Sequence, residues 1–570
     1  MKTGEGSGLM SAINVNVKTR QATFDRVEIR SARFSHLVFL GALTAIGVIL
    51  LGLILSILRL NNGTFLYTMD DPYIDLALSD QIRHGNYGLN PGEPSAPSSS
   101  ILYPLLEVPA SGTPLHPYLP LILNSLAMFA TIAIMHRFFV YLRLAQDGFG
   151  VVVEGIALVL FAVCFNLIAV VFTGFEHSLH IAATAACIYG LAVFLDTENM
   201  PAWLPAVIIV APLLRYEGLA LSVGAILVLA LRKRWWIASG TLVLIVLTVG
   251  GFSAFLVSLK LPPLPSSVLV KSQVVVTGMS GTKMGVIGSM LRNARSMSKD
   301  PVGLLLLLIG IAAAIVCISE FPAKPWHWTP RGLMSLVLVA MVGGHAAAGS
   351  FGWFNRYEDY LIVGTALICI YLKQETIRSA LLNRKRRLLW VSAGAVALLL
   401  ITSRYVTGYF SVPGNTHQLY EQNFQMHRFV NDFYRGPVAV YDIGLIAYHN
   451  PNYFLDLGGL SSEKARSILS DAVLNDVNST DMNPFGPLVS SSGVKVVILN
   501  EWPAEPDLTV PVSWKKVALL PISRQQMVLD PRVLFYTTDT PSAKELQPEL
   551  QAFSKSLPAG MKLTIYDSLP

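Results

Sequence analysis

The sequence predicts an α-helical polytopic membrane protein that ends in a soluble α/β domain, and three observations support this fold class. First, 53% of the 570 residues are hydrophobic and only 14% are charged, with a mean hydropathy of +0.52; soluble globular domains rarely have this composition. Second, the apolar residues lie in repeated runs, and most of these runs approach the length of about 18 residues that crosses a bilayer. Third, the C-terminal part lacks such runs and contains short strand-like segments instead.

The chain divides into three regions. Residues 1–34 are polar and basic and form an N-terminal cytoplasmic segment. Residues 35–404 form the transmembrane region, in which 61–116 is the first outer loop. Residues 405–570 form an extracytoplasmic α/β domain, where VAVYDIG and VKVVILN are strand-like runs between turn-rich pieces. About eleven crossings are expected, near 35–60, 117–135, 150–172, 178–195, 202–214, 219–231, 235–258, 301–318, 333–350, 359–372 and 388–403.

Basic residues set the expected orientation of these helices. Alternate loops carry Lys and Arg, among them the clusters 232–234 and 384–387, on the same side as the basic N-terminus. Cytoplasmic loops are enriched in Lys and Arg, so the N-terminus is expected in the cytoplasm and the C-terminal domain outside it. The first apolar run has no signal-peptidase cleavage pattern, so we expect it to be a transmembrane span and not a signal peptide. The loop 259–300 is an exception, because it should lie outside and yet contains six basic residues.

Charge and cysteine content exclude two classes of site. The net charge of +6 is modest, and the basic residues cluster beside the ends of the spans. They therefore indicate how the protein is oriented in the membrane, and a nucleic-acid partner is not expected. The four cysteines all lie in apolar runs, so they offer neither a disulfide framework nor a zinc site; they are Cys164, Cys187, Cys317 and Cys369.

The first outer loop concentrates acidic side chains. Residues 67–107 contain six carboxylates against a single arginine. Pro72 suits the first turn of a helix and disfavours the helical conformation at Asp71, so a short helix over 73–84 is expected, with Asp70 and Asp71 at its start. Two interpretations are equally weighted here. The acids cap the helix and complement its dipole, or they take part in chemistry.

Two of the predicted spans are too short to cross a bilayer. The segments 202–214 and 219–231 have about 13 residues each, or roughly 20 Å of helix, against a hydrocarbon core of about 30 Å. The RYEG turn between them therefore places Arg215 and Glu217 within the outer part of the membrane. Ionisable residues at such depth are costly and indicate function. The alternative is a structural ion pair that closes a helical hairpin.

Other polar groups interrupt apolar sequence on the same expected side. The TGFEH turn contains Glu176 and His177, the segment PSSVLVKS contains Lys271, and NRYEDY contains Arg356 and Tyr357. Together with the RYEG turn they predict a cavity with carboxylates that can act as bases and with cations that can hold a phosphate. The membrane location suits a substrate with an apolar tail. A histidine inside a span, at position 345, is expected to be a satisfied packing residue.

These motifs resemble, in order, those of the bacterial GT-C fold glycosyltransferases. The loop DDPYIDLALSDQIRHGNYGLN resembles their first outer loop, TGFE their "SGxE" turn and LLRYEG their "RPEG" turn. LPSSVLVKS, NRYEDYLI and VAVYDIGLIAYHNPNYFLDLGGLSS resemble three later segments of the same enzymes. The mycobacterial arabinofuranosyltransferases are similar, and the resemblance covers about residues 67–460.

The resemblance implies an inverting transfer of a sugar from a polyprenyl-phosphate carrier to a glycan, lipid or protein acceptor, in the bacterial inner membrane with the C-terminal domain on the periplasmic side. Asp70 would be the general base, and Asp71 would orient it or the acceptor. No obligatory metal is implied, although a divalent cation could bridge Asp70 and the phosphate. The residues implied to bind substrate are Glu176, His177, Arg215, Glu217, Lys271, Arg356 and Tyr357, with the three cations on the lipid phosphate.

Two other function classes share part of this pattern. A membrane transporter or lipid flippase also has broken helices and charges inside the membrane, but it often shows two matching halves, and the sequence shows no internal repeat. A membrane scaffold whose outer domain binds a partner would leave the charges inside the membrane unexplained.

Overall fold

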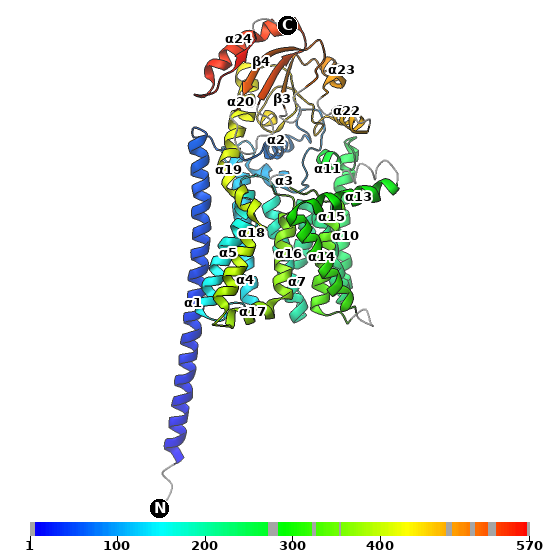
Figure 1. Cartoon of the computed structure of the whole chain (residues 1–570). Helices are drawn as coiled ribbons and strands as arrows, with labels where there is room; N and C mark the ends of the chain where they lie inside the picture. The colour runs from blue at the N-terminus through cyan, green and yellow to red at the C-terminus, as the bar shows by residue number, and fades with distance from the viewer. Residues whose placement is uncertain are drawn as a thin grey trace, which may run out of the picture.

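The computed structural model describes residues 6–271, 283–321, 327–352, 355–474, 481–501, 508–522 and 532–566. A bundle of long apolar helices stands below a small sheet domain, and the first loop lies between them (Figure 1). We refer to the end of the bundle beside the sheet domain as the domain end. This architecture, a polytopic helical membrane protein with a C-terminal α/β domain, is the predicted fold class.

Each of the eleven predicted spans overlaps one or more apolar helices, but the count of eleven crossings stays a prediction. Among the described residues, six helices are long and apolar enough to cross a membrane, or up to eight if each of two bent helix pairs counts as one span. Three further apolar helices have fewer than 18 residues. The helices of the bundle are α1 (Gly6–Leu60), α4 (Leu119–Tyr141), α5 (Gly148–Cys164), α6 (Leu167–Val171), α7 (His177–Thr197), α8 (Leu204–Leu214), α9 (Gly218–Leu231), α10 (Trp235–Ser258), α14 (Pro301–Ser319), α15 (Pro330–Ala348), α16 (Asp359–Leu372), α17 (Gln374–Leu382), α18 (Arg387–Ile401) and α19 (Ser403–Glu421).

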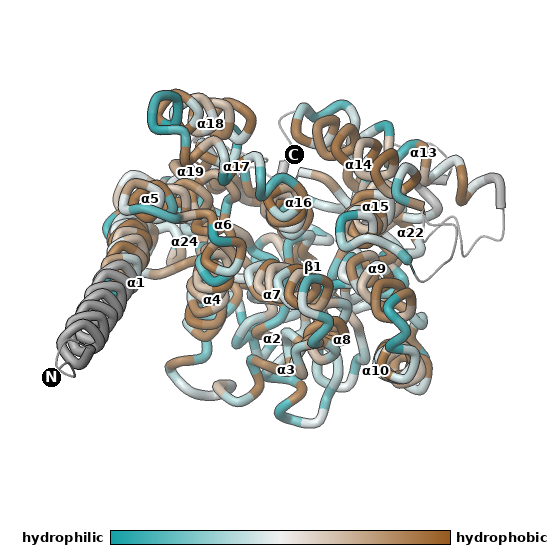
Figure 2. The backbone as a smooth tube through the Cα atoms, turned by 90° about the horizontal axis from the view of Figure 1, so that it is seen from below, coloured by the Kyte–Doolittle hydropathy of each residue, from teal (hydrophilic) through white to brown (hydrophobic). Residues whose placement is uncertain are grey.

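Burial separates the central helices from those at the periphery. In α7 and α15, 67% and 56% of the most apolar window is buried, whereas in α10 only 17% is buried. Seen from below, α7 lies among its neighbours, and α1, α10 and α14 lie at the rim (Figure 2). Large apolar side chains are exposed on these rim helices, such as Leu51, Leu247 and Ile315. A helix that exposes apolar side chains all along its outer face is suited to lipid.

The first loop folds into short helices at the domain end. They are α2 (Pro72–Arg83), α3 (Tyr103–Glu107), η1 (Val108–Ala110) and η2 (His116–Tyr118), and α11 (Ser266–Lys271) and α13 (Lys283–Lys299) come from a later loop. The predicted helix over 73–84 is thus α2, with Pro72 in its first turn. Asp71 adopts the helical conformation in spite of the following proline and makes no capping hydrogen bond through its side chain. The capping interpretation of Asp71 is therefore wrong.

The sheet domain contains a mixed six-stranded sheet in the order β2-β1-β3-β5-β4-β6. Strand β1 is parallel to β2 and β3, whereas β5 pairs antiparallel with β3 and β4, and β6 pairs antiparallel with β4. The predicted run VAVYDIG contains β1, and the run VKVVILN contains β3 except for its last residue. The strands are β1 (Val438–Val440), β2 (Phe454–Asp456), β3 (Val496–Glu501), β4 (Lys515–Pro521), β5 (Arg532–Thr537) and β6 (Thr564–Ile565), and the helical elements are α20 (Asn423–Arg428), η3 (Phe429–Phe433), α21 (Gly444–Ala447), α22 (Glu463–Leu474), η4 (Asn483–Phe485), α23 (Gly486–Ser491) and α24 (Thr540–Ser556).

The first loop and the sheet domain share one hydrophobic core. Tyr73, Leu76 and Ala77 of α2 belong to the same buried cluster as Val440 of β1 and Phe535 of β5. These three α2 residues follow the i, i+3, i+4 spacing that places side chains on one face of a helix. The acidic loop is therefore held against the sheet domain by packing.

Candidate active site

The RYEG turn between α8 and α9 holds Arg215 at the domain end of the bundle. Helix α8 ends at Leu214, and Arg215 has extended backbone before α9 begins at Gly218. A Cβ on Gly218 would clash with the backbone of Ala211, so this close return of the chain requires glycine. The turn is therefore compact enough to keep two ionisable side chains together.

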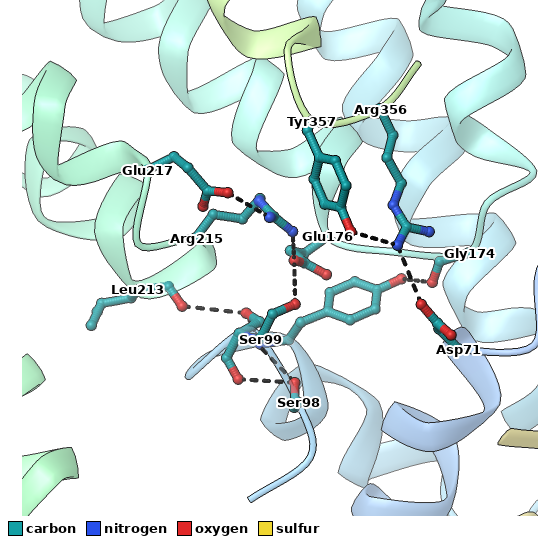
Figure 3. A network of polar contacts seen from close by, with 12 residues as sticks. Asp71, Ser98, Ser99, Gly174, Glu176, Leu213, Arg215, Glu217, Arg356 and Tyr357 are labelled. Atoms are coloured by element: carbon teal, nitrogen blue, oxygen red, sulfur yellow. Dashed lines mark hydrogen bonds and ion pairs between the residues drawn. The ribbon is translucent and has the colours of Figure 1, made fainter. Parts of the chain in front are cut away.

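Arg215 is bound by two carboxylates. Its Nη1 donates to Glu176 Oε1 at 2.6 Å and its Nη2 donates to Glu217 Oε1 at 2.7 Å (Figure 3). Glu176 is fully buried and Arg215 is 5% exposed, and Ser99 Oγ lies 3.4 Å from the same glutamate oxygen. The Nε–H of Arg215 has no hydrogen-bond partner among the described residues. The Arg215–Glu217 ion pair, which the sequence offered as the structural alternative, is present, and Glu176 from a distant turn contributes a second carboxylate.

Arg356 forms a second, adjacent ion pair. Its Nη2 donates to Asp71 Oδ2 at 3.2 Å and to the Tyr357 hydroxyl at 3.2 Å, and its Nη1 contacts the sulfur of Met69. Tyr357 lies between the two arginines, with its ring 5.4 Å from the Arg215 guanidinium and 5.0 Å from that of Arg356 (Figure 3). The structure thus brings together two of the three predicted cations.

Asp70 contacts the sheet domain through its carboxylate. Its carboxylate accepts hydrogen bonds from the backbone N–H groups of Gly444 at 2.5 Å and Leu445 at 2.8 Å, at the start of α21. A Cβ on Gly444 would clash with the backbone carbonyl of Asp70. Burial and the nearby charge of Asp442 raise the pKa of Asp70, and the two N–H groups oppose this only in part. Asp70 is therefore both oriented by the sheet domain and easier to protonate than an ordinary carboxyl.

Three other predicted positions have different surroundings. The ring of buried His177 lies 5.6 Å from that of Phe175 and 6.0 Å from that of Tyr357. The side chain of Lys271 lies outside the described residues. Nδ1 of the histidine at position 345 bonds the Tyr360 hydroxyl at 3.2 Å. Its buried Nε2 has no hydrogen-bond partner among the described residues, and the residue lines the cavity beside Arg215, so the expectation of a satisfied packing residue is met only in part.

The two acids of the NRYEDY segment that follow Tyr357 serve other contacts. Glu358 accepts hydrogen bonds from the Tyr405 hydroxyl and the Gly352 amide, and Asp359 accepts one from Asn166. These contacts hold the start of α16 in place, and they differ from the contacts of Arg215 and Arg356 described above.

A cavity of about 560 Å³ opens beside Arg215. Arg215, Glu217, Ser99, Ser267 and Tyr357 form polar parts of its wall. The remaining wall is mostly apolar and comes from α9, from α11 and the residues just before it, and from α15, with the side chains Leu219, Ala220, Val223, Leu264, Val268, Ala340 and Ala348. Such a cavity can take a ligand that has both a charged group and an apolar chain.

Sequence reasoning missed the partners of Asp70. Asp442 and Gly444 lie within the VAVYDIG run, which was identified only as a strand and as part of the resemblance. No local pattern shows that a glycine amide will meet a carboxylate of the first loop, because 374 residues separate the two.

Comparisons with known proteins give similarities of fold. Residues 415–536 match a family model described as a domain of unknown function (DUF8728), and no curated protein matches the chain. The archaeal oligosaccharyltransferase from Archaeoglobus fulgidus, solved in complex with Zn and sulfate, is similar with 12% identity and a TM-score of 0.46 over 90% of this chain and 74% of that one. The same enzyme, AglB, with an inhibitory peptide and a dolichol-phosphate has 11% identity and a TM-score of 0.41 over 86% and 75%.

The mycobacterial arabinofuranosyltransferase AftD is also similar, with 13% identity and a TM-score of 0.36 over 87% of this chain and 42% of that one. AglB and AftD are both GT-C fold glycosyltransferases, the class that the sequence motifs resemble. Because identity and TM-scores are low, the function proposed below depends on the side chains of the site.

Proposed function

We propose that this protein is an inverting glycosyltransferase that moves a sugar from a polyprenyl-phosphate carrier to a glycan, lipid or protein acceptor at the domain end of the bundle. The observation that carries the proposal is the cavity beside Arg215. Its apolar wall from α9 and α15 suits a polyprenyl chain, and its charged wall suits the phosphate. The expected setting is the bacterial inner membrane, with the N-terminus cytoplasmic and the sheet domain periplasmic.

The donor phosphate would bind through Arg215. The two Nη groups of this arginine are held by glutamates, which fix the plane of the guanidinium, and its buried Nε–H lacks a partner among the described residues. A phosphate oxygen would satisfy that donor. Because the described site has more carboxylates than cations, a phosphate needs further positive charge. Lys271 lies one helical turn beyond Ser267 and Val268, which line the cavity, and is the residue we assign to supply it.

Asp70 would act as the general base. In the transfer, the acceptor oxygen forms a bond to the anomeric carbon as the bond from that carbon to the phosphate oxygen breaks, and the acceptor proton passes to Asp70. The raised pKa of Asp70 suits this role, since a base works best when its pKa lies near the operating pH. Asp71 would position Arg356 through their ion pair, while Glu176 and Glu217 position Arg215. The transfer step in this proposal needs no obligatory metal.

Binding of a phosphorylated lipid tests the site. Wild-type protein in nanodiscs should bind a polyprenyl phosphate more tightly than the matching polyprenol, and Arg215→Lys should weaken only the phosphorylated ligand. Lysine keeps the charge but loses the planar fork, and one lost charged hydrogen bond is worth about 1.5–3 kcal/mol, or roughly ten- to a hundredfold in affinity. Arg378→Lys is the matched control, because Arg378 pairs with exposed Glu375 in α17, at the far end of the bundle. Equal affinity of wild type and Arg215→Lys for the phosphorylated lipid would contradict the proposal, as would transport of that lipid without sugar transfer.

A further inference from the structure

A second cluster of ionisable side chains lies at the same interface, away from the cavity. Asp80 comes from the last turns of α2, His116 begins η2, and His449 follows α21 of the sheet domain. One ligand atom from each of these three residues lies within 4.8 Å of the other two. Three segments that are distant in sequence therefore present two imidazoles and a carboxylate to one point.

The hydrogen bonds of His116 fix which ring nitrogen is free to bind. Ser79 Oγ donates to the Leu76 carbonyl at 2.8 Å, so it accepts at 2.8 Å from the Nε2–H of His116. In the neutral imidazole, Nδ1 then carries a lone pair. This lone pair faces Asp80 Oδ1 at 3.4 Å, and the only donor beside it among the described residues is the Tyr448 hydroxyl, at 3.2 Å. Asp80 Oδ1 also accepts a hydrogen bond from the Ser111 hydroxyl. A cation between Nδ1 and the carboxylate would have a lone pair on each side.

The three groups are close enough to share one ion. His449 Nε2 lies 3.2 Å from Asp80 Oδ2, and His116 Nδ1 lies 3.4 Å from Oδ1. Two imidazoles and a carboxylate are the ligand types that a zinc ion with an open coordination position takes. The bond from His116 to Ser79 is the kind of contact that usually orients a histidine ligand. The His449 side chain is 55% exposed, which leaves room for a water ligand.

The backbone at His449 supports a specific role for this residue. Its φ is +55°, in the left-handed region that residues other than glycine rarely adopt. Such strained backbone is common where a side chain must be held in one orientation. The ring of His449 stacks on that of Tyr448 with centroids 3.9 Å apart, which also holds the ring in place.

We propose that Asp80, His116 and His449 bind a zinc-type divalent ion that fastens the sheet domain to the first loop. Helices α2 and α21 meet at two points. At the start of both helices, the Asp70 carboxylate accepts hydrogen bonds from two N–H groups of α21. In the last turn of α2, Asp80 meets His449, which follows the end of α21. An ion at the second point would hold the two helices in register at the first.

The proposed site contains no cysteine. The sequence expectation that no zinc site is available was argued from the four cysteines, and histidine and aspartate ligands were not considered in it. Metal binding here does not depend on the proposed transfer reaction.

Metal content and cobalt spectroscopy test the site without any activity assay. The full-length protein, purified with a tag that contains no histidine and then treated with a chelator, should take up one Zn²⁺ per chain in equilibrium dialysis. Co²⁺ should give the visible bands of a four-coordinate site. Zn²⁺ should also raise the thermal unfolding midpoint, because a ligand that binds only the folded state stabilises it.

Variants at the exposed end of the site separate metal binding from folding. His449→Ala and Asp80→Asn should lose the cobalt bands and the zinc-dependent shift of the midpoint. His449→Cys should keep zinc binding and add a thiolate-to-cobalt band in the near ultraviolet, because cysteine is also a zinc ligand. His84→Ala is the control, since the exposed ring of His84 bonds the backbone carbonyl of Asp80 and not its carboxylate. Uptake of less than one ion by wild type, or unchanged uptake by folded His449→Ala, would overturn the proposal in favour of a simple histidine–aspartate ion pair.

Discussion

Replacement of Asp70 by asparagine is the most informative single change, because Asp70 contacts the sheet domain and is also the proposed general base. Asparagine keeps the size but cannot take a proton at neutral pH. If Asp70 is the general base, turnover should fall by about 10²–10⁴, which corresponds to about 2.7–5.5 kcal/mol of barrier. The variant also has one acceptor oxygen where the wild type has two, so one of the bonds from Gly444 and Leu445 is lost.

Gly444→Ala separates these two effects. Its methyl group would clash with the Asp70 backbone and push the two segments apart, while the carboxyl group itself is retained. Both variants should lower the thermal unfolding midpoint, since each bond to the carboxylate contributes roughly 1.5–3 kcal/mol. Only Asp70→Asn should remove the proton acceptor.

The dependence of turnover on pH distinguishes a base from a structural contact. Burial and Asp442 raise the pKa of Asp70, so wild-type turnover should be full above this raised pKa and should fall as the pH drops through it. In Gly444→Ala this fall in turnover on the acid side of the pH profile (the acid limb) should move to higher pH, because the two N–H groups that favour the ionised form of Asp70 are displaced. In Asp70→Asn the acid limb should be absent. Single-turnover transfer from a polyprenyl-phosphate sugar, with detergent-solubilised enzyme, measures all three. Wild-type turnover by folded Asp70→Asn, or an unchanged acid limb, would refute the role of Asp70.

Three further outcomes are expected. Asp71→Asn should reduce turnover less than Asp70→Asn, measured in the same transfer assay, and its loss of stability should stay below the 3–5 kcal/mol of a fully buried broken pair, because 32% of the Asp71 side chain is exposed. Both carboxylate oxygens of buried Glu107 lack a hydrogen-bond partner among the described residues, and burial raises the pKa of Glu107 well above its usual range. The folded state therefore favours the protonated form, so the thermal midpoint should fall as pH rises through that pKa and should vary less with pH in Glu107→Gln. A cysteine at exposed Ser491 of α23 should react with an impermeant maleimide in intact cells, whereas protection would reverse the proposed orientation.

Local patterns predicted the elements of the site better than its contacts. Pro72 and the apolar spacing that follows it were sufficient to predict α2 within one residue at each end. The RYEG turn was sufficient to offer an Arg215–Glu217 ion pair as one alternative, because two residues on one tight turn lie close together, and the structure contains this pair. Neither pattern indicates Glu176, whose approach to Arg215 depends on how α7 packs against α8. For the same reason the sequence pointed to free cations for a phosphate, whereas the described arginines are already paired.

The adjacent acids Asp70 and Asp71 show why a local pattern could not assign their roles. In a helical turn, successive side chains point about 100° apart, and Asp71 has helical backbone. Two such carboxylates cannot both face the same partner. Asp70 faces the amides of α21 in the sheet domain, and Asp71 faces Arg356 beside the bundle. The pair therefore connects both parts of the protein, so a shift of the sheet domain relative to α2 would displace Asp70 while Arg356 still held Asp71. An ion at Asp80, His116 and His449 would oppose that shift from the other end of α2.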